Sequence, residues 1–150
     1  MALRQIRLSD DEILRKKSKR VDVIDDKIRL ILDDMADTMR EAHGAGLAAP
    51  QMGILKRLVV IDMGQGLLKL VNPEIIMQEG TQQVIEGCLS IPNLLGKLNR
   101  PAKVKIRAQN ENGEEVVLTG SGDLAKCFCH EIDHLEGILF TDFVTEYLRK

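Results

Sequence analysis

The strongest constraint in this sequence is a segment near its end that is predicted to be a helix with two unlike faces. The helix is expected to begin at Ser121 or Asp123, to run to about Leu135 and to end at Gly137. At 100° per residue, one stripe of it is apolar and consists of Leu124, Phe128, Ile132 and Leu135. The other side carries His130-Glu131-Ile132-Asp133-His134. Such a helix packs its stripe into a core and presents the histidines to a site.

Two histidines four residues apart lie one turn apart on one helix face, so the imidazoles of His130 and His134 can hold the same metal ion. Glu131 projects beside that face, where it can take a proton from a water molecule on the metal. A catalytic metal site also needs a third protein ligand and an open fourth position. Among the cysteines and acids of the chain, Cys88 has the best surroundings, in Glu86-Gly87-Cys88-Leu89-Ser90, where a glycine frees the backbone.

Other roles for the cysteines stay open. A lone cysteine such as Cys88 is commonly a buried structural residue. Cys127 lies one turn before His130 on nearly the same face, whereas Cys129 points about a right angle away from it. Both are therefore weaker ligand candidates than Cys88.

A third segment, Gly44-Ala45-Gly46-Leu47-Ala48-Ala49-Pro50-Gln51, begins with the loose dinucleotide-binding pattern Gly-x-Gly-x-x-Ala, and residues 120–125 repeat that pattern. Neither segment is interpreted as a nucleotide site. The first follows a helix rather than a strand, and Pro50 prevents a helix from opening there. The second is followed by too few residues for a second βαβ half. The first segment instead predicts a close approach of the backbone to a ligand, with the Gln51 amide available as a donor.

The rest of the chain predicts the elements that surround the late helix. A short helix is expected at Ser9-Asp10-Asp11-Glu12, with Ser9 as its cap, and a longer one from Asp25 to His43, stopped by Gly44. Asn112-Gly113 is a predicted hairpin turn, and Asn72-Pro73 is predicted to close a strand. The predicted strands are 58–61, 67–71, 74–79, 82–85, 104–107 and 115–118. The fold class is therefore α+β: one domain over residues 1–150 with N-terminal helices, short and mostly antiparallel strands, and a late buried helix carrying the histidine motif.

Composition narrows the function classes. With 150 residues, 44% of them apolar, the chain is large enough for one compact domain with a real core. A net charge of −2 gives no reason to expect a specific nucleic-acid partner, and the basic cluster 15–20 is interpreted as a solvated loop because no aromatic residue interleaves it. The chain shows neither an apolar run long enough for a membrane span nor a signal peptide. Three cysteines do not form a disulfide framework, which favours the cytoplasm.

The histidine motif, the segment around Cys88 and the segment from Gly44 to Gln51 together resemble, in order and spacing, the three signature motifs of the peptide deformylases. The resemblance extends over about residues 3–144. It implies one divalent metal per chain, held by Cys88, His130 and His134. Members of the family generally use Fe2+ in the cell and accept Zn2+, Ni2+ or Co2+, and a Cys-His-His site suits zinc as well as iron.

The resemblance also implies the reaction. The family removes the N-formyl group from the initiator methionine of nascent polypeptides and releases formate. Hydroxide generated at the metal attacks the formyl carbon, with Glu131 as general acid and base and Gly46 near the formyl group. Gln51 and the backbone N–H of Leu89 stabilise the oxyanion. The residues expected to contact the substrate are Gly44, Ala45, Val84, Glu86, Gly87, Lys126 and Cys127.

Partners and supporting contacts follow from the same resemblance. Glu86 and Arg100 resemble the family's supporting ion pair beside the cysteine. The implied partners are N-formyl-methionyl nascent peptides and the ribosome near its exit tunnel, and the implied state is a cytoplasmic monomer. Some members dock on the ribosome through a long C-terminal extension, of which only a few residues follow Phe143 here.

The sequence departs from the family pattern where the substrate is expected. Cys129 stands where the family usually has glutamine, and Asp123 and Lys126 stand at usually apolar positions of the ligand face. Lys126 is expected to lay its methylenes along the methionine pocket and to send its charge to solvent or to Asp123, the alternative being a surface position. These substitutions keep open a catalytically weak or inactive homologue that binds formylated N-termini. A zinc endopeptidase is another alternative, but it leaves Cys88 and the segment from Gly44 to Gln51 without a role.

Overall fold

The computed structural model describes residues 2–149, which form one α+β domain. Its two α-helices within that range are α1 (Asp26–Glu41) and α2 (Asp123–Leu135). Three short 3-10 turns accompany them, η1 (Glu12–Arg15), η2 (Ala49–Met52) and η3 (Phe140–Asp142). The strands are β1 (Gly46–Ala48), β2 (Leu58–Ile61), β3 (Leu68–Glu79), β4 (Gln82–Cys88), β5 (Ile91–Arg100), β6 (Lys103–Gln109), β7 (Glu115–Ser121) and β8 (Glu146–Arg149).

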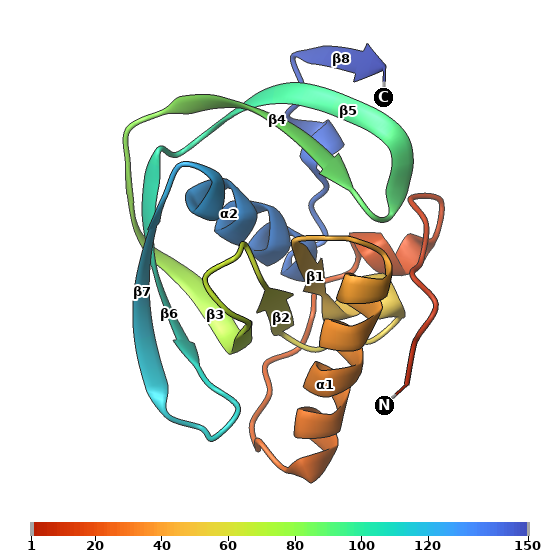
Figure 1. Ribbon diagram of the computed structural model, residues 1–150, viewed down its shortest axis with the longest axis vertical. Helices are drawn as coiled ribbons and strands as arrows, with labels where there is room; N and C mark the ends of the chain where they lie inside the picture. The colour runs from red at the N-terminus through yellow and green to blue at the C-terminus, as the bar shows by residue number, and fades with distance from the viewer. Residues whose placement is uncertain (1, 150) are drawn as a thin grey trace.

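These strands pair antiparallel in two sheets. One has five strands in the order β1-β2-β3-β6-β7, and the other has three in the order β4-β5-β8. Figure 1 shows α2 in the middle of the molecule, between the β4–β5 hairpin and the larger sheet, with α1 beside β1 and β2. The predicted fold class, α+β with mostly antiparallel strands and a late buried helix, is confirmed.

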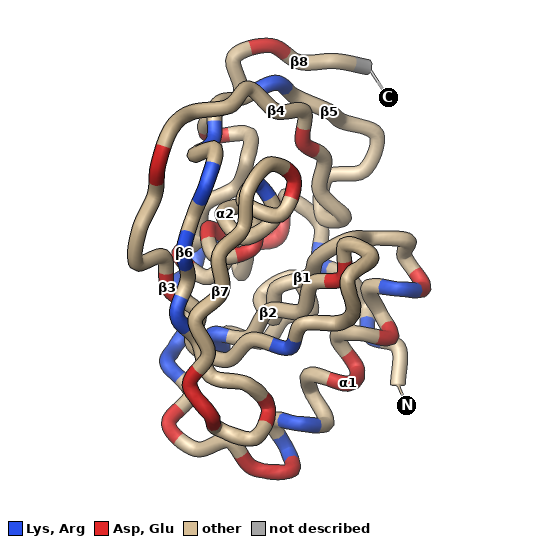
Figure 2. The backbone as a smooth tube through the Cα atoms, turned by 60° about the vertical axis from the view of Figure 1, so that its left-hand side comes forward, with Lys and Arg blue, Asp and Glu red and all other residues tan. Residues whose placement is uncertain are grey.

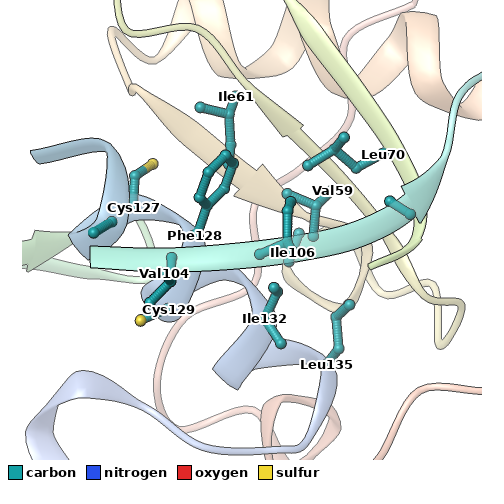
Figure 3. Close-up of a cluster of buried hydrophobic side chains, with 13 residues drawn as sticks. Val59, Ile61, Leu70, Val104, Ile106, Cys127, Phe128, Cys129, Ile132 and Leu135 are labelled. Carbon is teal, nitrogen blue, oxygen red and sulfur yellow. The ribbon is translucent and has the colours of Figure 1, made fainter. Parts of the chain in front are cut away.

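The hydrophobic core is divided by β2, because its side chains alternate between two faces. Val59 and Ile61 pack in one cluster with the apolar stripe of α2, whereas Leu58 and Val60 pack in another with α1. Figure 3 shows the ring of Phe128 reaching from α2 into the first cluster, where it has no exposed surface. The stripe predicted from the sequence therefore packs as expected, and it fixes α2 with its histidines turned toward β4.

The prediction that Asn72-Pro73 closes a strand is wrong. β3 continues through both residues, and its register against β6 shifts between Val71 and Glu74. Asn72 takes the left-handed conformation with φ 53°, and its side chain accepts the Val21 N–H and donates to the Val21 carbonyl, both at 2.8 Å. Because asparagine tolerates this conformation and proline fits at a bulge, the pair bends the strand without ending it.

Strand lengths also differ from the prediction. The expected strand 82–85 continues to Cys88, and β1, β5 and β8 were not predicted at all. β5 contains Pro92, Asn93 and Gly96, which are poor strand formers, so its sequence reads as a loop. The hairpin turn at Asn112-Gly113 is confirmed, with Gly113 at φ 83°.

Two predicted caps in the N-terminal half are wrong. The first helix is only the 3-10 turn η1, and its cap is Asp11, whose carboxylate accepts the Ile13 N–H, rather than Ser9. At the end of α1 the left-handed residue is His43, with φ 58°, and not Gly44. The Gly44 N–H follows it and donates to Met39 O at 2.9 Å, which completes the C-terminal cap.

The C-terminal end of α2 is as predicted, but its N-terminal cap is not. Its N-cap is Gly122, at φ 59° and without a side-chain cap bond, so neither Ser121 nor Asp123 takes that place. Glycine is needed there because the chain turns sharply from β7 into α2 through a positive φ. Gly137, at φ 75°, follows the last turn as predicted.

No helix within residues 2–149 is long and apolar enough to cross a membrane. Figure 2 shows acidic and basic residues interspersed along the backbone. In the basic cluster 15–20, Arg15 pairs with Asp142 at 2.8 Å, and Lys16, Lys17 and Lys19 are exposed. The cluster is therefore a solvated surface segment, as predicted.

Candidate metal centre and active site

Three predicted ligands come together at the inner face of α2. His130 and His134 lie one turn apart, with ring centroids 5.0 Å from each other. Cys88 reaches them from the end of β4, and the ligand atoms of the three residues all lie within 4.8 Å of one another. The Cys88 Sγ is 3.4 Å from His134 Nε2. The two ring nitrogens and the sulfur are thus arranged as one donor set of the kind that binds zinc or iron.

The turn at the end of β4 brings Cys88 to the helix. The register of the β4–β5 hairpin shifts between Glu86 and Cys88, which turns the cysteine out of the regular ladder. Gly87 lies at the shift, where an added Cβ would come within 2.9 Å of the Leu95 side chain. Gly87 therefore favours close packing beside Cys88, but it does not adopt a positive φ, so the predicted freedom of the backbone is not what the structure uses there.

A buried ion pair orients His130. Its Nδ1 lies 2.7 Å from Glu86 Oε1, and the same carboxylate accepts two bonds from Arg100, at 2.6 and 3.0 Å. Burial acts to raise the pKa of Glu86, but the hydrogen bonds from Arg100 and His130 outweigh it and hold that pKa at about 2. Glu86 is therefore ionised and accepts a hydrogen bond from the Nδ1–H of His130, which leaves Nε2 of His130 free to bind a metal.

Arg100 has a second acid partner in α2. It donates to Asp133 at 2.7 Å, so the guanidinium joins β4 and α2 through two carboxylates. The ion pair of Glu86 and Arg100, implied by the family resemblance, is present in the structure. The contribution of Asp133 was not predicted, although its position three residues after His130 places it near the same face of the helix.

Glu131 lies in the same pocket and is buried, with 4% of its surface exposed. Burial raises the pKa of Glu131 to about 7. An added Cβ on Gly46 would come within 2.7 Å of Glu131 Oε2, so the carboxylate lies directly against the backbone of β1. Among the described residues, nothing bonds to Glu131 Oε1 or to His134 Nδ1. Buried polar atoms of this kind need a partner, and a metal ion with its water would supply one at Glu131, so the donor set and its surroundings fit a bound ion.

Gln51 is held in place by three bonds. Its Oε1 accepts the Ala48 N–H at 3.0 Å, and its Nε2 donates to Ser90 Oγ at 3.1 Å and lies 3.5 Å from Cys88 Sγ. The amide is therefore oriented with its NH2 group toward the cysteine. Pro50 is the second residue of the 3-10 turn η2, which presents Gln51 to the site instead of continuing β1.

A cavity of about 250 Å³ opens beside the metal ligands. Most predicted site residues line it, and Met63 is the one lining residue among those described that was not predicted. Met63 follows β2 in a loop without any motif, so no sequence pattern pointed to it. The predicted residues that line the cavity are Gly44, Ala45, Gly46, Gln51, Glu86, Gly87, Cys88, Leu89, Lys126, Cys127, His130 and Glu131.

Val84 is placed elsewhere. It was expected to contact the substrate, but it packs in a separate apolar cluster with Leu98 and Phe140 and does not line the cavity. Val84 and Glu86 share the inner face of β4, but Val84 lies two residues farther from Cys88, where Leu98 and Phe140 pack against it.

The two cysteines of α2 point in different directions, as Figure 3 shows. Both belong to the core cluster around Phe128, but Cys127 also lines the cavity and Cys129 does not. Burial raises the pKa of both thiols, that of Cys129 to about 11, so both are neutral near pH 7. Neither is part of the donor set around Cys88, in line with their rank as weaker candidates.

Lys126 lies along the cavity wall. Its Nζ donates to the Ile85 carbonyl at 3.3 Å and lies 3.7 Å from Asp123 Oδ1. The expectation that its charge goes toward Asp123 agrees with this geometry, and the alternative of a surface position outside the cavity does not.

A small α+β domain with a Cys-His-His donor set and a buried glutamate beside one cavity has the site of a metal-dependent hydrolase. A family model for polypeptide deformylase matches residues 3–150. The chain is 69% identical over 150 residues to peptide deformylase 2 of Clostridium acetobutylicum, covering 99% of this chain and 100% of that one. The chain therefore belongs to the peptide deformylase family.

Solved structures agree with this assignment. The peptide deformylase of Thermotoga maritima matches with a TM-score of 0.94 and 38% identity, covering 97% of this chain and 99% of that chain. The peptide deformylase of Synechococcus elongatus, in complex with actinonin, matches with a TM-score of 0.92 and 42% identity. The match covers 97% of this chain and 85% of that chain. A catalytic deformylase is supported, and neither a zinc endopeptidase nor a homologue that only binds formylated N-termini is.

Proposed function

We propose that the chain binds N-formyl-methionyl N-termini of nascent peptides in the cavity beside Cys88 and hydrolyses the formamide bond. The observation that carries the proposal is the position of Glu131, a buried carboxyl group with a pKa of about 7, against Gly46 and beside the predicted metal ligands. A carboxyl group with such a pKa can both accept and return a proton near neutral pH.

Cys88, His130 and His134 would hold one divalent ion per chain. Such an ion lowers the pKa of a bound water molecule and supplies hydroxide near neutral pH. The charged Glu86 supports this role, because it fixes the ring of His130 and raises its basicity as a ligand. Fe2+ is the ion expected in the cell from the family resemblance, and the thiolate and imidazole donors also suit Zn2+, Ni2+ or Co2+.

The other residues act on the formyl group and on the leaving amine. As the carbonyl oxygen becomes negative, the Gln51 amide and the Leu89 N–H donate to it, and one such donor is commonly worth ~3–4 kcal/mol. Glu131 takes the proton of the attacking water and passes it to the amine nitrogen. The formyl C–N bond then breaks, and formate and a free N-terminus leave.

Substrate binding is proposed to use both walls of the cavity. One wall is the backbone of Gly44, Ala45 and Gly46, and the other is Glu86 and Gly87 on β4. Lys126 and Cys127 close the end of the cavity along α2. The small residues let a peptide backbone approach closely, which fits an extended formyl-peptide.

The proposal also covers the oligomeric state of the protein, its compartment and its place of action. We expect the protein to act as a monomer in the cytoplasm on peptides emerging from the ribosome near its exit tunnel. The three free cysteines are consistent with a reducing compartment.

Formate release tests the proposal directly. Protein purified without oxygen and loaded with Fe2+ or Zn2+ is mixed with formyl-Met-Ala-Ser and with the N-acetyl peptide of the same sequence. We expect formate from the first peptide, no acetate from the second, and intact Met-Ala and Ala-Ser bonds by mass spectrometry. Cleavage of an internal peptide bond, or no formate release, would overturn the proposal.

A further inference from the structure

We propose that Lys126 is a specificity-determining residue that lets the cavity accept formylated residues of methionine length whose side chain ends in an oxygen acceptor. Methionine sulfoxide and glutamate are the two natural side chains with that chemistry. The inference rests on the proposed function, since it concerns the substrates of the same site. Lys126 lies on α2 among the residues that line the cavity.

Lys126 lies one helical turn before His130, and both line the cavity, whereas His134 does not. The cavity therefore extends from the metal ligands toward the start of α2. Four residues of helix correspond to a rise of ~6 Å. In a formyl-methionyl substrate the sulfur is five bonds from the formyl carbon, which spans roughly 6 Å when extended, given ordinary bond lengths. A side chain placed with its formyl carbon near His130 thus ends beside Lys126.

The ammonium group of Lys126 is held at this end of the cavity. Its Nζ donates to the carbonyl of Ile85, which directly precedes the lining residues Glu86 and Gly87. The second neighbour is the Asp123 carboxylate at 3.7 Å. An ammonium has three N–H donors, so one donor remains for an acceptor in the cavity.

The charges around Lys126 leave this donor effective. Asp123 has a side chain that is 77% exposed, so water screens its attraction for Lys126. Glu86, the nearest acid of β4, is already bonded to Arg100 and His130. Among the described residues that line the cavity, Lys126 is the one lysine or arginine.

The end of the substrate side chain decides how well it uses this donor. The thioether of methionine is a weak acceptor, and norleucine has none. A sulfoxide or carboxylate oxygen of the same reach can accept a charge-assisted hydrogen bond, which is stronger than one between neutral groups. Methionine sulfoxide is a common oxidative product of methionine, so a formylated N-terminus with an oxidised initiator is a realistic substrate.

The test compares four peptides, formyl-X-Ala-Ser with X as methionine, norleucine, methionine sulfoxide or glutamate. Values of kcat/KM are measured for the metal-loaded wild type, for Lys126→Met, which keeps the length and removes the charge, and for Lys17→Met as a matched control. Lys17 is exposed in the segment after η1 and does not line the cavity. Each value is expressed relative to norleucine in the same variant.

In Lys126→Met we expect the sulfoxide and glutamate ratios to fall roughly tenfold, a typical scale for one contact in a pocket. Norleucine turnover persists, and Lys17→Met leaves both ratios unchanged. Asp123→Asn should raise the glutamate ratio, because it removes a competing carboxylate. An unchanged sulfoxide ratio in Lys126→Met would overturn the inference, whatever happens to glutamate. The proposed function fails differently, since the wild type would then release no formate even from formyl-methionine.

Discussion

His130 Nδ1 lies 2.7 Å from Glu86 Oε1, although 44 residues separate them in the chain. Glu86 is 3% exposed and also bonded to Arg100, so its charge is fixed and buried. This contact connects the β4–β5 hairpin to α2 and sets the ring of a metal ligand. The geometry of the site therefore depends on a buried ion pair, whose carboxylate orients a metal ligand and also lines the cavity.

Replacing this carboxylate should affect both metal binding and stability. In Glu86→Gln the ring of His130 loses its charged partner, and we expect a metal affinity ~10–100-fold lower. Arg100 keeps only Asp133, so the free energy of unfolding should fall by about 3–5 kcal/mol, as when a buried pair loses one partner. Competition with a chelator and denaturant titration measure the two effects.

Glu74→Gln is the matched control for this variant. Glu74 pairs with Arg107 at the surface, where both side chains are about half exposed, so little change is expected. Equal metal affinity in Glu86→Gln and Glu74→Gln would contradict the role given to Glu86.

The ligand set predicts which cysteine matters for the metal. Elemental analysis should find close to one metal per chain in the wild type and little in Cys88→Ala or His134→Ala, because each removes one of three protein ligands. Cys127→Ala and Cys129→Ala should keep the metal. Full metal content in Cys88→Ala, or loss in Cys129→Ala with the fold intact, would be incompatible with the assignment.

Gly46 is expected to be essential for catalysis but not for metal binding. In Gly46→Ala the new Cβ would come within 2.7 Å of Glu131 Oε2 and push the carboxylate out of place. We expect kcat to fall by at least ~100-fold, since a small misplacement of a catalytic group has effects of this size. The metal content and the melting temperature should change little. Normal kcat in this variant would show that Glu131 does not need its position against β1.

Phe128 should be among the most important core residues, because its ring is fully buried between α2 and β2. Phe128→Ala is expected to lower the free energy of unfolding by about 3–5 kcal/mol. Val117→Ala is the comparison, since Val117 on β7 is 52% exposed. Similar losses in the two variants, measured by denaturant titration, would contradict the packing described for α2.

The late helix and its ligands could be predicted because they depend on local patterns. The stripe of Phe128 and its neighbours repeats at helical spacing, and His130 and His134 must share a face in any helix. β5 could not be predicted, because its proline, asparagine and glycine are poor strand formers. It is a strand because it pairs with β4 on one side and β8 on the other, which only the folded chain shows.

Some residues of the candidate site could likewise be predicted from the sequence, whereas others are placed only by the folded chain. Cys88 was found through its glycine neighbour and the family resemblance, but its distance from His134 is set by a register shift in the hairpin. Met63 and the carbonyl of Ile85 carry no sequence signal, because a loop position and a backbone atom have no motif. Val84 shares a face of β4 with Glu86, but tertiary packing against Leu98 and Phe140 places it outside the cavity.

The central claim is that Glu131 carries the proton and is not a ligand of the metal. It is tested most directly by Glu131→Gln, which keeps the size of the side chain and removes its acid–base function. Metal content is measured by elemental analysis and turnover by formate release from formyl-Met-Ala-Ser. We predict one metal per chain and a kcat lower by ~10²–10⁴, the usual contribution of general acid–base catalysis. Near-normal turnover with the metal in place would contradict the account.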